Sequence, residues 1–189
     1  MQKKQLIIQK IAIIGSFVLS IIMIFYALGY STNLYHLVFH VDPMSTMLYV
    51  PGAGIYNIVQ PFNRLLFRHT LFLFLVCLTL FVTLTHKRRL YYVSNYITSL
   101  GFAGYSVYIA LMIMHYNTMY RNLYLQVDFA RLREITDRFN LRYVESTLML
   151  DMGFVLAFIL IGFAALLVLN LVLKTIWTRR EKWLDEEAK

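Results

Sequence analysis

Long apolar stretches alternate with polar segments along this chain, and their lengths predict helices that cross a membrane. Four stretches are predominantly apolar over about the 20 residues that a spanning helix requires. They cover residues 11–29, 64–85, 91–114 and 152–173. The pattern therefore predicts an all-α integral membrane protein, in which residues 1–189 form a single four-helix transmembrane bundle.

The positions of the basic residues predict which ends of the spans face the cytoplasm, because cytoplasmic segments carry an excess of Lys and Arg. With both termini cytoplasmic, that side holds 11 of the 18 Lys and Arg residues. These are Lys3, Lys4, Lys10, Lys87, Arg88, Arg89, Lys174, Arg179, Arg180, Lys182 and Lys189. We therefore expect cytoplasmic termini, a tight cytoplasmic turn between the second and third spans, and a cytoplasmic tail at residues 174–189.

The two segments on the opposite side are too long and too apolar to be simple turns. They cover residues 30–63 and 115–151. The second contains apolar residues at helical spacing, namely Phe129, Leu132, Ile135 and Phe139, with charged residues between them. This pattern predicts an extracytoplasmic amphipathic helix between the third and fourth spans.

Composition narrows the class of protein further. Hydrophobic residues make up 59% and charged residues 15% of the chain, whereas soluble domains have about 45–50% and about 25%. These values exclude a soluble globular domain, a disordered chain and a nucleic-acid-binding protein. The single cysteine, Cys77, cannot form an internal disulfide bond, and the chain has no Asn-x-Ser/Thr acceptor. We expect a multi-pass protein of the cell membrane, either a bacterial inner membrane or another plasma membrane.

The third span carries small and polar residues along one side of the predicted helix. They recur at spacings of three and four, at Ser94, Thr98, Gly101, Tyr105, Tyr108, Met112 and His115. Hydroxyl groups are costly in lipid, so this stripe should face protein or water. Two interpretations remain open: a helix-packing surface, and the lining of a path for a solute.

Charged residues near the outer ends of two spans suggest an ion pair. Arg64 and Arg68 are four residues apart at the start of the second span, and Asp151 lies at a similar depth on the fourth, close to Glu145. The sequence predicts that at least one of the arginines pairs with one of these carboxylates, with contact to lipid phosphate as the alternative.

No pattern of catalytic, metal-binding or cofactor-binding residues stands out. His36 and His40 are four residues apart, with Asp42 just beyond, but the spacing of a zinc protease is absent. We therefore expect no enzyme activity, no cofactor and no metal. The favoured hypothesis is an accessory or scaffolding subunit that binds other membrane proteins, within a transporter or export assembly. The alternative is a small oligomeric transporter or channel lined by the stripe of the third span.

Overall fold

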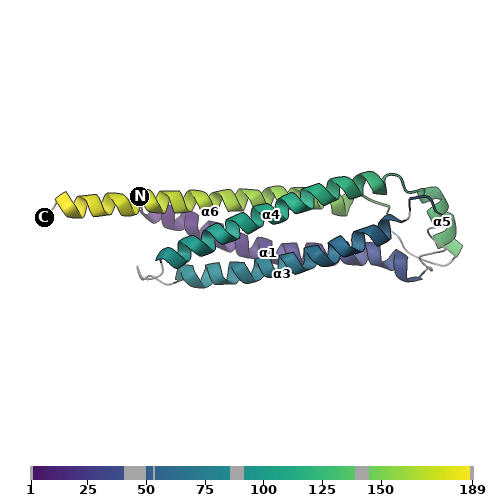
Figure 1. Ribbon diagram of the computed structural model, residues 1–189, viewed down its shortest axis with the longest axis horizontal. Coiled ribbons are helices and arrows are strands. Elements are labelled where there is room, and N and C mark those ends of the chain that lie inside the picture. Colours follow the sequence, from purple (N-terminus) through teal and green to yellow (C-terminus); the bar gives the residue numbers. More distant parts are fainter. Residues whose placement is uncertain (1, 41–49, 53, 86–91, 139–144, 188–189) are drawn as a thin grey trace. The chain divides into compact units, whose positions relative to one another are not determined.

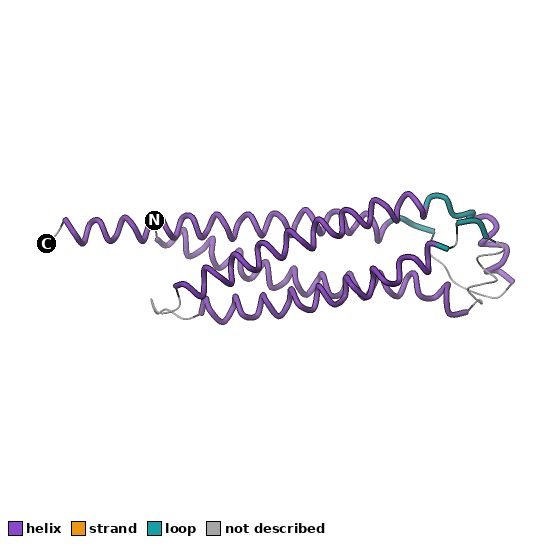
Figure 2. Tube along the Cα trace, viewed as in Figure 1, coloured by secondary structure: helices purple, strands orange, loops and turns teal. Residues whose placement is uncertain are grey.

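The computed structural model describes residues 2–40, 50–52, 54–85, 92–138 and 145–187. Every regular element in these residues is an α-helix (Figures 1 and 2). The helices are α1 (Gln2–His40), α3 (Ile55–Thr85), α4 (Tyr92–Tyr124), α5 (Phe129–Arg138) and α6 (Leu148–Glu187). The prediction of an all-α chain is thus confirmed over the described residues.

Four of these helices are long and apolar enough to cross a membrane, judged by length and composition. The candidate spans are Ile7–Tyr30, Asn57–Val82, Val93–Tyr124 and Leu148–Ile176. This confirms the four predicted spans and a multi-pass membrane protein. The side of the membrane on which each terminus lies stays a prediction.

The helices continue beyond the limits that the sequence predicted for the spans. Helix α1 runs on to His40, inside the predicted outer segment 30–63, and α4 runs past residue 114 to Tyr124. The limits that the sequence predicts for a span mark where its run of apolar side chains ends. A helix can continue into the headgroup region, because its backbone groups bond within the helix in any solvent. The predicted turn between the second and third spans, and the side chains of His36, His40 and Asp42, lie outside the described part of the structure.

Helix α5 occupies the position where the sequence predicts an amphipathic helix. The Asp128 carboxylate accepts a hydrogen bond of 3.0 Å from the backbone N–H of Arg131, as an N-cap residue does. Leu132 is fully buried, whereas Arg131 and Arg133 are exposed. The amphipathic character is therefore confirmed, while the side of the membrane on which α5 lies stays a prediction.

The contacts divide the chain into two compact units, and each unit contains part of all four long helices. The first unit comprises Met1–Ile21, Phe72–Tyr108 and Phe158–Lys189, and the second comprises Ile22–Leu71 and Ile109–Ala157. Each unit therefore brings together segments of α1, α3, α4 and α6 that are far apart in the sequence.

Within the first unit, neighbouring helices meet in a closed order. The Phe17 ring of α1 lies 5.7 Å from that of Phe74 on α3. The ring of Phe72 lies 5.1 Å from that of Tyr105 on α4. Tyr96 of α4 donates a 3.1 Å hydrogen bond to the Leu171 carbonyl of α6. Contact of α6 with α1 completes a bundle with the order α1–α3–α4–α6, because the Phe163 ring fills the space beside Gly15.

The same order of neighbours recurs within the second unit. The Tyr30 ring of α1 lies 6.0 Å from that of Phe62 on α3, which in turn lies 4.6 Å from the Tyr116 ring of α4. Hydrogen bonds described below join α4 to α6 and α6 to α1. Each unit is therefore a four-helix bundle within itself. The single bundle of residues 1–189 stays a prediction.

A turn before α3 packs against the segment between α4 and α5. The backbone N–H of Asp128 donates a 3.1 Å hydrogen bond to the Pro51 carbonyl. Gly52 follows with φ of +81°, and a Cβ atom there would lie 2.7 Å from the Gln126 carbonyl oxygen. Both the left-handed backbone and this close approach require glycine at position 52.

We predict that Gly52→Ala destabilises the protein by about 1–3 kcal/mol, because alanine strains the backbone at positive φ and its Cβ meets Gln126. Gly104→Ala is the control, since a Cβ at position 104 of α4 meets nothing within 4 Å. That change should stabilise the helix by up to about 1 kcal/mol. Thermal unfolding in detergent measures both, and equal unfolding temperatures would contradict the prediction.

Candidate functional site

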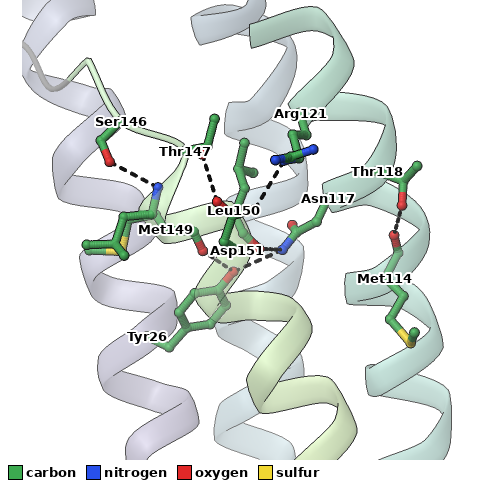
Figure 3. Close-up of polar contacts among 11 residues, drawn as sticks. Tyr26, Met114, Asn117, Thr118, Arg121, Ser146, Thr147, Met149, Leu150 and Asp151 are labelled. Atoms are coloured by element: carbon green, nitrogen blue, oxygen red, sulfur yellow. Dashed lines mark hydrogen bonds and ion pairs between the residues drawn. The ribbon is translucent and has the colours of Figure 1, made fainter. Parts of the chain in front are cut away.

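A connected polar group lies inside the second unit, around a buried asparagine of α4 (Figure 3). Asn117 is 0% exposed. Its Nδ2 donates hydrogen bonds to the Tyr26 hydroxyl at 3.2 Å and to the Leu150 carbonyl at 3.0 Å. The Tyr26 hydroxyl donates in turn to the Met149 carbonyl at 3.1 Å. This set, which we name the Asn117 cluster, joins α1, α4 and α6.

A glycine of α6 makes the close approach of these three helices possible. A Cβ atom at Gly153 would lie 2.1 Å from the Asn117 Nδ2 and 2.2 Å from the Tyr26 hydroxyl oxygen. No side chain fits there unless one of these two groups moves away. The first turn of α6 thus supplies two acceptors, the carbonyls of Met149 and Leu150. One turn later, Gly153 leaves the space that their donors occupy.

An ion pair lies beside the Asn117 cluster, at the start of α6 (Figure 3). The Arg121 Nε lies 3.1 Å from the Asp151 Oδ1. The Thr147 hydroxyl, from the residue that precedes α6, donates a 2.7 Å hydrogen bond to the Asp151 Oδ2. A carboxylate in a first helical turn is also stabilised by the helix dipole. Each charged side chain is 46% exposed, so the pair adds modestly to stability.

The structure does not pair Arg64 or Arg68 with Asp151 or Glu145, although the sequence predicts such a pair. Asp151 pairs with Arg121, and Glu145 pairs with Arg133 at 2.7 Å. Among the residues that the structure describes, no carboxylate pairs with Arg64 or Arg68.

The reason lies in the direction that these arginines take around the axis of α3. Phe62 and Leu66 are buried and face the interior of the second unit. Two residues further along a helix is more than half a turn, about 200° around the axis. Arg64 and Arg68 therefore lie on the opposite side of α3, where both are exposed.

The predicted stripe of the third span lies mostly on the outside of the chain. Ser94, Gly101, Tyr108 and His115 are exposed, Thr98 and Tyr105 are half-buried, and Met112 is buried. The Tyr105 ring packs against α3, and it stacks on the Tyr108 ring at 6.0 Å. Within a single chain, the stripe is therefore not the main packing surface of α4. Its role in contacts between chains stays a prediction.

The packing surface of α4 lies one residue further along, and sequence reasoning missed it. Its buried polar residues are Asn95, Ser99, Ser106 and Asn117. These residues lie within about 40° of one another around the helix axis. That spacing is visible in the sequence, but the sequence alone does not show which side of a membrane helix is buried within the chain.

Some buried polar atoms of the second unit accept no hydrogen bond from the described protein groups. They are the Asn117 Oδ1, the Asn63 Oδ1 and the Tyr30 hydroxyl. Ordered water is the usual partner of such groups. The cluster therefore combines neutral amide, phenol and backbone groups, which hold helices together rather than form a pair of nucleophile and base. The described residues also contain no group of three or more His, Cys, Asp or Glu side chains that could hold a metal ion.

Comparison with known protein families, with curated proteins and with solved structures finds no match for this chain.

We predict that Gly153→Ala destabilises the protein by about 1–3 kcal/mol, because the added methyl group overpacks the site and displaces the donors of the Asn117 cluster. Gly162→Ala on the same helix is the matched control, since a Cβ there meets nothing within 4 Å. Only the first change should lower the unfolding temperature in detergent. A Gly153→Ala protein as stable as the control would show that the three helices do not meet as described.

Proposed function

We propose that this chain is a non-catalytic accessory or scaffolding subunit of a larger membrane protein complex, and that it binds its partners through α4. The class of complex that we favour is a transporter or export assembly in a cell membrane. The observation that carries the proposal is the small and polar stripe on the exposed side of α4.

A small and polar stripe is poorly suited to lipid. The Ser94 hydroxyl and the Tyr108 side chain, which is 51% exposed, lie within the candidate span of α4. Small and polar side chains along a membrane helix are typical of surfaces that contact another helix. Helix α4 is also the least apolar of the four candidate spans. Both features favour a protein neighbour over lipid along this side.

Two glycines on the same side favour close approach by another helix. At Gly101 and at Gly104, a Cβ atom would meet nothing within 4 Å. Both residues are exposed, and Ser94 and Thr98 continue the surface with small side chains. Small residues at such spacings let the backbones of two membrane helices approach closely. A helix of another subunit fits this surface.

The chemistry of the interior supports a structural role. The Asn117 cluster consists of neutral groups that bond to one another and to the backbone of α6. The ion pair of Arg121 and Asp151 lies beside it and is half-exposed. Groups arranged in this way fix helices in place, and they favour a scaffold over an enzyme.

The expected result of native purification in mild detergent is that other polypeptides are recovered with the chain at fixed stoichiometry. The double change Gly101→Leu and Gly104→Leu should abolish that recovery, because the larger side chains prevent close approach of a partner helix. Neither residue has a neighbour at its Cβ within the chain, so the chain itself should still fold.

Gly162→Leu is the matched control, since this glycine is also open but lies on α6. It should leave the partners bound. Recovery of the wild-type chain as a lone monomer, stable in mild detergent, would overturn the proposal. So would partners that stay bound to the double variant.

The second candidate function is a small oligomeric transporter or channel, and the exposure of Tyr108 and His115 on the stripe favours it. In an assembly of several copies, these side chains would line a path between chains. Tyr108→Phe should then change the flux or selectivity for a polar solute in proteoliposomes, because it removes one hydroxyl and keeps the ring. An oligomer of this chain alone, with unchanged flux after the substitution, would contradict this candidate.

A further inference from the structure

The outward side of α3 contains a hollow that neither the packing surfaces nor the proposed assembly uses. Its volume is about 320 Å³, and it is open to the surroundings. The residues that line it are Asn57, Gln60, Pro61, Arg64, Leu65 and Arg68. All of them belong to one stretch of α3, so the hollow forms wherever that stretch is helical.

The spacing of the lining residues explains the hollow. Asn57, Pro61, Leu65 and Arg68 follow one another at intervals of four and three, which places them along one side of the helix. The proline ring is short and leaves space between the longer side chains around it. The positions of Gln60 and Arg64, again four apart, border that space on the adjoining side.

The hollow is strongly electropositive. Its lining includes two guanidinium groups and no carboxylate. Within the described residues, the carboxylates of Asp151 and Glu145 pair with Arg121 and Arg133. Both arginines of the hollow are exposed, so their charges are available to an anion.

The position of the hollow along α3 matches the level of lipid headgroups. Helix α3 has 31 residues, a length of about 46 Å at 1.5 Å per residue. The hydrocarbon core is only about 30 Å thick, so about 16 Å of the helix lies beyond it.

The candidate span Asn57–Val82 is about 39 Å long, which is more than the thickness of the core, and its polar residues Asn57, Gln60 and Arg64 lie at its N-terminal end, which places that end toward the headgroup layer. Helical side chains tilt toward the N-terminus, so both arginines lean toward that layer.

We propose that this hollow is a binding site for a phosphate group, carried by an anionic membrane lipid. The planar guanidinium groups of Arg64 and Arg68 bind the phosphate oxygens through paired N–H donors. The amide groups of Asn57 and Gln60 bind the polar remainder of the headgroup. The volume lies near the lower limit of ligand pockets, about 300–1,000 Å³, and therefore suits a headgroup rather than a whole lipid.

The test measures the binding of phosphatidylglycerol to the purified full chain in neutral detergent, by native mass spectrometry over a range of lipid concentrations. Arg64→Gln with Arg68→Gln should raise the apparent dissociation constant at least about tenfold, because charge-assisted bonds to the phosphate are lost. The matched control is Arg131→Gln with Arg133→Gln. It removes the same charge from α5 and should leave binding unchanged.

Inorganic phosphate, added without lipid, distinguishes the two sources of the ligand. The proposal expects no arginine-dependent binding of this ion at millimolar concentration. Binding as tight as that of phosphatidylglycerol would assign the hollow to a free anion and overturn the lipid assignment.

Equal lipid binding by the wild type and the Arg64–Arg68 double variant would overturn the site itself. If that double variant fails to fold, Arg64→Gln and Arg68→Gln are tested singly against Arg131→Gln. Each should weaken lipid binding at least about threefold, and unchanged binding in both would again overturn the site.

Discussion

The organisation of the described chain depends on the contact of three helices at Gly153. Without a side chain at this position, the amide of Asn117 and the hydroxyl of Tyr26 both reach the backbone of α6. A buried amide is shielded from bulk water, so its donors must find acceptors within the protein. The choice of glycine on one helix therefore decides whether a polar residue on another can be buried at all. The remaining packing of the second unit, including its aromatic rings, surrounds this point.

The two surfaces of α4 illustrate how a helix in a membrane divides its polar residues. On the buried side they are two serines, Ser99 and Ser106, and two asparagines, Asn95 and Asn117. On the exposed side they include tyrosines, whose rings are compatible with lipid and whose hydroxyls are polar. The buried side of α4 thus has polar residues that allow close packing, whereas its exposed side has large amphipathic ones. A partner protein that binds α4 would meet the second kind of surface.

The sequence predicted the four spans and α5 because both depend on patterns along a single helix. Apolar length identifies a span, and the spacing of Phe129 and Leu132 identifies an amphipathic helix. The rotation of each helix around its own axis was not predictable in the same way. Helices in lipid are apolar on both sides, so the usual contrast between a polar surface and an apolar core disappears. The sequence therefore does not show that Asn95 and Ser99, one residue beyond the stripe, are the buried positions of α4, or that Arg64 and Arg68 lie on the exposed side of α3.

The closed order α1–α3–α4–α6 places the first and last spans of the chain next to each other, which has a consequence for biosynthesis. Membrane helices leave the ribosome in sequence, at about 5–20 residues per second. Until α6 emerges, Asn117 and Tyr26 are in the bilayer without the carbonyl groups that they later bond. The first three spans therefore wait as an incomplete set with exposed polar groups. Retention of such an intermediate by the insertion machinery would be favoured over its release into lipid.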